Sequence, residues 1–283
     1  MSGGVMANFG ELQPPSEEPL LFLKLGGSLI TEKSRTHTPR LEVLDRLAQE
    51  IAEARRQGFA RRLILGHGSG SFGHMAADRY GTRQGVHTPD EWTGFSKVWQ
   101  EAAALNHLVM QALGRAELQA LAFPPSATLV ALDGRLKRWE LGPLQMALQA
   151  GLLPVVYGDV AFDTRRGGTI LSTENLFDYL ARVLRPLYIL LAGIEAGVWA
   201  DYPACTRLLD EISPQSLEGE AENLRGSAFT DVTGGMRSKV RQSLDLVQAV
   251  PGLQVWIFSG VEPGSVYRAL CGQRTGTLIH ALT

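Results

Sequence analysis

The sequence predicts an α/β fold, a three-layer αβα sandwich with a central, mostly parallel sheet. Short apolar runs alternate with helical patterns along the whole chain, and this alternation favours a parallel sheet that helices cover on both faces. Glycine-rich or polar residues follow several of the apolar runs. In open α/β sheets the ligand crevice lies beyond the carboxyl ends of the strands, so these segments predict one extended site at that edge.

Six apolar runs have the composition of buried strands, and the segments between them have helical periodicity. The predicted strands are residues 20–25, 63–65, 128–132, 153–157, 187–191 and 254–258. The predicted helices are residues 41–56, 94–121, 141–150, 174–184 and 239–249. Thr38-Pro39 and Thr88-Pro89 are typical helix starts, and Gly58 and Gly151 follow predicted helix ends.

The bulk properties indicate a globular enzyme with a sizeable core. The chain has 283 residues, of which 45% are hydrophobic and 20% are charged. No linker divides it, so we predict a flexible leader over residues 1–19 and a single domain over residues 20–283. The leader is rich in proline and glutamate and lacks the basic start and apolar run of a signal peptide.

Charge and cysteine content restrict the partners that we expect. The formal net charge of -2 argues against a nucleic-acid or anionic-membrane surface. No apolar run is long enough for a membrane helix. Cys205 and Cys271 have no metal-binding or redox spacing. We therefore expect a soluble, cytoplasmic protein without nucleic-acid or membrane partners.

The first candidate site is the turn Gly26-Gly27-Ser28, which follows the strand residue Lys24. Glycines let backbone N–H groups approach an anion closely, and the lysine adds a compact positive charge. A tight turn beside a solvent-facing lysine is the alternative. A lysine within an apolar strand favours the anion site, because its charge is costly to bury without an anionic partner.

The second candidate site is the loop 66–74, which contains Gly68, Ser69, Gly70, Gly73 and His74. Residues 68–73 match the G-x-G-x-x-G dinucleotide fingerprint. That fingerprint requires a long helix and a second strand after the loop, and residues 74–95 have neither pattern. We therefore interpret the loop as a different kind of anion site, in which His74 donates a hydrogen bond to a phosphate.

A third glycine-rich segment leads into the predicted helix 239–249. It contains Asp231, Gly234, Gly235 and Lys239. A helix N-terminus is a natural anion site, and a lysine there opposes the helix dipole unless an anion lies nearby. A flexible loop with a solvated basic patch is the alternative.

Weaker signals come from short polar segments elsewhere in the chain. Lys33 lies in a polar loop, Gly158-Asp159 follows a predicted strand, and residues 193–199 form a turn beside a second ligand region. Ser172 is a predicted N-cap with Glu174 in the first helical turn. Glu174 could also hold lysines in position.

Taken together, residues 20–279 resemble the amino acid kinase superfamily and, within it, the isopentenyl phosphate kinases. The resemblance rests on residues 24–31, on Gly70-Ser71-Phe72-Gly73-His74, on residues 157–160, on residues 231–239 and on the closing segment 276–279. His74 is the most specific element, because superfamily members that phosphorylate amino acids lack it. The resemblance implies the amino acid kinase-like fold, with an acceptor-binding lobe at 20–186 and a nucleotide-binding lobe at 187–283.

The resemblance also implies roles for the candidate residues, with ATP and Mg²⁺ as cofactors, the Mg²⁺ carried by ATP. It implies that the chain phosphorylates isopentenyl phosphate for isoprenoid synthesis and forms a homodimer. The implied catalytic residues are Lys24, Lys33, His74, Glu174 and Lys239. The implied ATP-binding residues are Lys24, Gly26, Gly27, Ser28, Gly193, Gly197, Asp231, Gly234, Gly235 and Lys239. The implied acceptor-binding residues are Gly68, Ser69, Gly70, Gly73, His74, Gly158 and Asp159.

The sequence departs from the family pattern at three places. Glu174 replaces an aspartate, Ser69 interrupts a glycine run, and residues 192–198 lack the usual aspartates near the nucleotide. A related phosphonate kinase of the fosfomycin type, a non-catalytic nucleotide-binding regulator and a dinucleotide-dependent oxidoreductase remain as alternatives.

Overall fold

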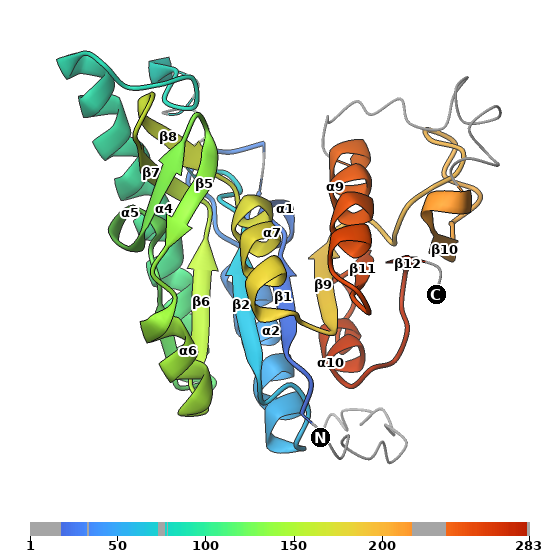
Figure 1. The fold of residues 1–283 in the computed structure, drawn as a ribbon. Helices are drawn as coiled ribbons and strands as arrows, with labels where there is room; N and C mark the ends of the chain where they lie inside the picture. The colour runs from blue at the N-terminus through green and yellow to red at the C-terminus, as the bar shows by residue number, and fades with distance from the viewer. Residues whose placement is uncertain (1–17, 33, 73–76, 78, 217–235, 282–283) are drawn as a thin grey trace.

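A computed structural model describes residues 18–32, 34–72, 77, 79–216 and 236–281. These residues form an eight-stranded sheet with helices on both faces and a separate four-stranded sheet (Figure 1). The arrangement confirms the predicted α/β class and the three layers. Among the described helices, none combines the length and the apolar composition that crossing a membrane requires.

The eight-stranded sheet has the strand order β10-β12-β11-β9-β1-β2-β6-β3. Its described neighbours pair in parallel, except for β11 and β12, which are antiparallel. The strands are β1 (Leu21–Leu25), β2 (Leu63–His67), β3 (Ala120–Ala122), β6 (Leu153–Tyr157), β9 (Tyr188–Gly193), β10 (Glu211–Ile212), β11 (Gln254–Ser259) and β12 (Thr277–His280). The central position of β1 brings the loop that follows it to the middle of the sheet edge.

Two apolar clusters fill the spaces between this sheet and the helices. One face packs against α2 (Leu41–Arg56), α4 (Pro89–Arg115) and α10 (Ser265–Leu270). The other packs against α6 (Gly142–Gln149), α7 (Thr173–Leu184) and α9 (Met236–Ala249). The short helices α1 (Gly27–Ile30) and α5 (Pro125–Thr128) complete the described helices with assigned bounds.

Strand β1 determines which helices Lys24 faces. Leu21, Leu23 and Leu25 belong to the cluster beneath α2 and α10, whereas Phe22 belongs to the cluster beneath α7 and α9. Successive side chains of a strand point to opposite faces. Lys24 therefore lies on the same side as Phe22 and faces the helices α7 and α9.

The four-stranded sheet lies on the side of the molecule that carries β6 and α4 (Figure 1). Its order is β5-β4-β7-β8, and its strands are β4 (Leu129–Leu132), β5 (Arg135–Trp139), β7 (Asp159–Asp163) and β8 (Gly167–Leu171). Only residues 128–132 of this sheet were predicted as a strand. The sheet positions Asp159 at the start of β7, directly after the end of β6.

The predicted helix over residues 94–121 is correct in type and wrong in its bounds. Thr88 caps α4 through a capping box with Glu91, as the Thr88-Pro89 signal predicts, so the helix begins at Pro89. It ends at Arg115, and Glu117 then adopts a positive φ of 61°. The chain reverses there, and Ala120–Ala122 pairs with β6 as an edge strand instead of continuing the helix.

Candidate active site

A cavity of about 770 Å³ opens at the carboxyl ends of the central strands. Residues from the loops after β1, β2, β6 and β9 line it, so the structure brings the four predicted loops together. Of the predicted site residues, the lining includes Lys24, Gly26, Gly27, Ser28, Gly68, Ser69, Gly70, Gly158, Asp159, Glu174, Gly193, Gly197 and Lys239. Lys33, Gly73, His74, Asp231, Gly234 and Gly235 lie outside the described residues.

The two glycine loops at the cavity floor are in direct backbone contact. A Cβ atom added to Gly27 would lie 2.4 Å from the amide nitrogen of Gly70. A Cβ added to Gly68 would lie 2.9 Å from the amide nitrogen of Gly27. Because any larger residue would collide with backbone, glycine is what allows the loops to approach this closely.

Each of these loops offers backbone donors to an anion. Within the described part of the chain, the amides of Gly27, Ser28, Ser69 and Gly70 donate no hydrogen bond to another residue. Exposed amide groups in such loops form concave sites for anions. Two adjacent loops of this kind can hold two phosphate groups next to each other.

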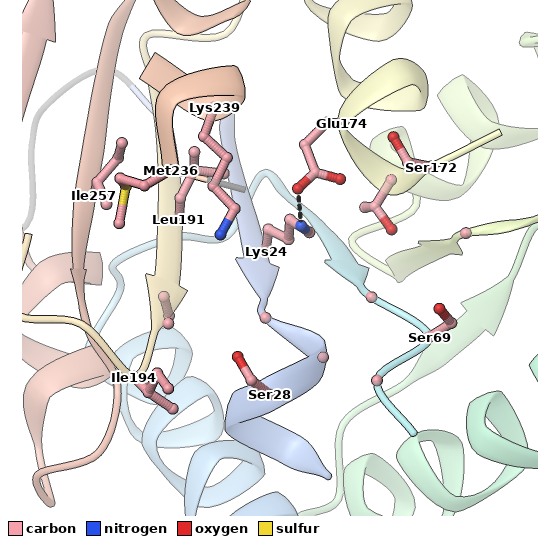
Figure 2. A pocket seen from close by; sticks show the side chains of 18 of the residues that line it. Lys24, Ser28, Ser69, Ser172, Glu174, Leu191, Ile194, Met236, Lys239 and Ile257 are labelled. Carbon is pink, nitrogen blue, oxygen red and sulfur yellow. Dashed lines mark hydrogen bonds and ion pairs between the residues drawn. The ribbon is translucent and has the colours of Figure 1, made fainter. Parts of the chain in front are cut away.

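Lys24 and Glu174 form an ion pair inside the cavity (Figure 2). Lys24 is only 7% exposed, so its ammonium group needs a partner. Glu174 lies in the first turn of α7, where Ser172 and Asn175 form a capping box. The predicted N-cap is thereby confirmed, and the longer glutamate side chain still reaches Lys24.

Lys239 reaches the same place from the first turns of α9 (Figure 2). Burial raises the pKa of the Glu174 carboxyl, but the charge and hydrogen bond of Lys24 outweigh burial and Lys239 adds to their effect. The pKa of Glu174 therefore lies below its usual range. The Glu174 carboxylate therefore lies between Lys24 of β1 and Lys239 of α9. Its negative charge keeps both ammonium groups near the cavity floor.

Gly66 on β2 makes room for the start of α7, the helix that carries Glu174. It is the register partner of Lys24, and a Cβ there would lie 2.6 Å from the Cγ2 atom of Thr173. Thr173 also donates a hydrogen bond to the carbonyl of His67 at 2.5 Å. The start of α7 is therefore fixed against β2, which brings Glu174 over the neighbouring strand.

Asp159 is a second buried carboxyl at the cavity wall, with 1% of its surface exposed. It accepts hydrogen bonds from the Val160 amide at 2.7 Å and from the Ser126 hydroxyl at 3.0 Å. Burial raises the pKa of Asp159 to about 7, although these hydrogen bonds act in the opposite direction. Near neutral pH its protonation state therefore responds to small changes in the surroundings.

We predict that Asp159→Asn removes a pH-dependent loss of stability. Because the pKa of this carboxyl is higher in the folded protein than the 3.8 of the free group, the unfolded chain ionises first and stability falls as the pH rises from 4 towards 7. One unit of pKa difference corresponds to about 1.4 kcal/mol, so the variant should gain on the order of 3 kcal/mol over wild type between pH 5 and pH 8. Thermal melts at both pH values measure this gain.

Asp201→Asn is the control for this prediction. A hydrogen bond from the Thr206 hydroxyl lowers the pKa of Asp201, so its contribution to stability is present at neutral pH and is lost in acid. Between pH 5 and pH 8 this carboxyl is ionised in both the folded and the unfolded chain, so the pH dependence of stability of the control should equal that of wild type over this range. Equal pH dependence of Asp159→Asn and wild type would contradict the prediction.

Several residues in the cavity wall or bonded to it were not predicted as site residues. Thr277 accepts a hydrogen bond from the Val198 amide at 2.8 Å and donates one to the Leu209 carbonyl at 2.6 Å, which fixes the turn after β9. The sequence predicts only a closing strand at residues 276–279. The cavity lining further includes Arg83, Gln84, Trp199, Tyr202 and Arg237. Residues 193–199 do line the cavity in part, as the weaker signal at this turn suggested.

The fold and the site define a phosphotransferase, in which paired lysines and glycine amides surround a cavity at the edge of a parallel sheet. The sequence model of the amino acid kinase family matches residues 19–259. The chain belongs to the amino acid kinase family.

Relatives of known activity match almost the whole chain. An isopentenyl phosphate kinase from Methanothermobacter thermautotrophicus is 34% identical over 92% of this chain and 98% of the relative. One from Haloferax volcanii is 33% identical over 88% of this chain and 98% of the relative. A solved structure of an isopentenyl phosphate kinase matches with a TM-score of 0.77 at 30% identity, over 92% of this chain and 99% of that chain.

Structures of more distant proteins show how widely the fold is used. A product complex of the Thermoplasma acidophilum isopentenyl phosphate kinase matches with a TM-score of 0.73 at 25% identity, over 92% of this chain and all of that chain. Carbamate kinase from Giardia lamblia has a TM-score of 0.68 at 16% identity, over 95% of this chain and all of that chain. At that identity the likeness shows the fold alone.

Proposed function

We propose that the chain transfers the γ-phosphoryl group of ATP to isopentenyl phosphate, giving isopentenyl diphosphate and ADP. The observation that carries this proposal is the contact, in one cavity, between two glycine loops whose amides donate to no other described residue. Such a pair suits a reaction in which donor and acceptor are both phosphates. The identity of the acceptor rests on the relatives that match nearly the full length.

The chemistry of this reaction requires little acid–base catalysis. The second pKa of a monophosphate is about 6, so the acceptor is largely ionised at neutral pH and can attack without a strong general base. The obstacle is the repulsion between two anions. Catalysis therefore consists of alignment and of positive charge over the transferred phosphoryl group. Lys24 and Lys239 supply that charge in this proposal, and Lys33 adds to it.

The two loops divide the substrates between them. Gly26, Gly27 and Ser28 hold ATP phosphates, together with Gly193, Gly197, Asp231, Gly234 and Gly235. Gly68, Ser69 and Gly70 hold the acceptor phosphate, together with Gly73, His74, Gly158 and Asp159. Glu174 holds Lys24 and Lys239 in position, which its ion pair with Lys24 supports. Residues 20–186 would then form the acceptor-binding lobe and residues 187–283 the nucleotide-binding lobe.

Mg²⁺ enters this proposal with the nucleotide. Among the described residues, no group of three or more His, Cys, Asp or Glu side chains is placed to hold a metal ion. Glu174 is engaged by Lys24. Mg²⁺ is commonly held through substrate phosphates and water, so we assign it to the phosphates of ATP, where it neutralises charge. We further propose a cytoplasmic homodimer that acts in a mevalonate pathway, as the resemblance implies.

The hydrocarbon tail of the acceptor requires an apolar wall. Val98 and Ala102 of α4 line the cavity together with Ala77 and Ile170. Trp99, which follows Val98 on α4, is 43% exposed and does not line the cavity. The wall is therefore formed by small and branched side chains, which fits a short branched tail.

An acceptor panel tests the proposed function. We expect purified protein with ATP and Mg²⁺ to phosphorylate isopentenyl phosphate with a kcat/KM at least about 100-fold above that for fosfomycin, because the acceptor site must match both phosphate and tail. Phosphorus NMR identifies the product. The activity with dimethylallyl phosphate measures how strictly the site selects the hydrocarbon tail of the acceptor. Preference for fosfomycin would favour a phosphonate kinase. Failure to consume ATP with every phosphorylated acceptor would favour a regulator, and binding of NADPH would revive the oxidoreductase.

A further inference from the structure

Thr31 connects the two glycine loops. Thr31 is the C-cap residue of α1, and it is fully buried. The hydroxyl donates a hydrogen bond to the carbonyl of Gly27 at 2.8 Å. The same oxygen accepts a hydrogen bond from the amide of Ser71 at 2.8 Å. One hydroxyl therefore joins the backbone of the first loop to that of the second.

The surrounding contacts leave little freedom at this junction. Gly70 has a positive φ of 54°, and a Cβ there would lie 2.1 Å from the Thr31 hydroxyl oxygen. The amide of Thr38 donates to the Ser71 hydroxyl at 3.2 Å, and the amide of His37 donates to the Ser71 carbonyl at 3.3 Å. Ser71 thus makes three hydrogen bonds with Thr31, His37 and Thr38, donating the first and accepting the other two.

We propose that Thr31 is a positioning residue that fixes the separation of the two phosphate-binding loops, and with it the approach of donor and acceptor. This inference rests on the proposed function for its catalytic consequence. Thr31 does not line the cavity, so it acts through the loop backbones rather than on a substrate. The hydroxyl bonds the Gly27 carbonyl and the Ser71 amide, not the amides of Gly27, Ser28, Ser69 and Gly70, so only the relative position of the two loops depends on it.

The kinetic test uses Thr31→Val, which keeps the shape of the side chain and removes the hydrogen bonds. Because misplacement by about 1 Å can cost about 100-fold in rate, we expect kcat to fall about 10- to 100-fold. Both KM values should change less than about threefold, since each loop still binds its phosphate. Thr31→Ser should restore kcat to within about threefold of wild type, because it returns the hydroxyl.

Thr128→Val is the matched control for loss of a threonine hydroxyl. Thr128 donates to the Pro124 carbonyl at 3.0 Å and accepts from the Trp139 indole at 3.0 Å. Like Thr31 it bonds the carbonyl four residues back, accepts one N–H group and does not line the cavity, but its partners lie outside the two glycine loops. The Thr128→Val variant should be less stable than wild type and should have the same kcat. A kcat of Thr31→Val within threefold of wild type, or no rescue by serine, would overturn the proposal.

Hydrogen exchange with a non-hydrolysable ATP analogue tests the coupling without any acceptor. In wild type, the analogue should slow exchange in peptides covering residues 26–31 and also in those covering residues 68–72. In Thr31→Val only the first set should be slowed. Equal protection of both sets in wild type and variant would overturn the inference about Thr31. Absence of phosphoryl transfer by wild type would instead contradict the proposed function, so the two failures are distinguishable.

Discussion

Gly27→Ala should abolish phosphoryl transfer while leaving most of the fold intact. The added Cβ would lie 2.4 Å from the nitrogen and 2.6 Å from the Cα atom of Gly70. These are backbone atoms, so no side chain can rotate away, and the two loops must separate. Separation of about 1 Å between reacting groups can cost about 100-fold in rate. We expect kcat to fall at least about 100-fold when ADP release is followed with isopentenyl phosphate as the acceptor.

Gly114→Ala provides the control for this substitution. Gly114 is exposed near the end of α4, and a Cβ there meets no atom within 4 Å. Alanine in a helix is more favourable than glycine by about 1 kcal/mol, so this variant should be slightly more stable and fully active. Wild-type kcat in Gly27→Ala would show that the loops can separate without loss of transfer, against the proposed arrangement.

Lys24→Met should also reduce kcat strongly, by about 100- to 1,000-fold, the usual effect of losing one charge-stabilising group. The methionine fills similar space but carries no charge for the transferred phosphoryl group. The substitution also leaves the half-buried Glu174 without its partner on β1, and a carboxylate that is largely shielded from water destabilises the fold when it has lost its partner. The pKa of Glu174 should then rise, and stability near neutral pH should decrease.

A double variant separates the two consequences. Lys24→Met with Glu174→Gln removes the half-buried carboxylate charge that lost its partner, so thermal stability should recover towards wild type while kcat stays low. Lys137→Met, at an exposed position of β5, is the control for loss of a lysine. Recovery of activity together with stability would mean that Lys24 is structural and has no role in transfer.

Much of the fold follows from local patterns in the sequence. The central strands are continuous apolar runs, and the starts of α4 and α7 are marked by the caps Thr88 and Ser172. The same logic marks Lys24, because a lysine within an apolar strand requires a partner. The overrun of the predicted helix beyond Arg115 has a local cause as well. Apolar spacing continues past that residue, and only the left-handed conformation of Glu117 ends the helix.

Contacts between distant segments account for what the sequence did not predict. Gly27 and Gly70 are 43 residues apart, and their contact depends on the pairing of β1 with β2. No sequence pattern distinguishes Thr31 from other polar residues. Its hydrogen bond with the Ser71 amide is visible only in the folded structure, where the two residues lie side by side. The strands β7 and β8 are short and contain polar and glycine residues, so their periodicity is weak. Their pairing in a second sheet is a property of the tertiary structure.

The contact between the two glycine loops has a consequence for how this sequence can evolve. It is made by backbone atoms, so its geometry depends on the lengths of both loops and on glycine at a few positions. Side chains nearby can vary more freely, as Ser69 between two glycines and Glu174 in place of an aspartate illustrate. Insertion or deletion of one residue in either loop would displace both at once. Among related sequences we therefore expect the lengths of the two loops to be conserved and the residues that surround the loops to vary.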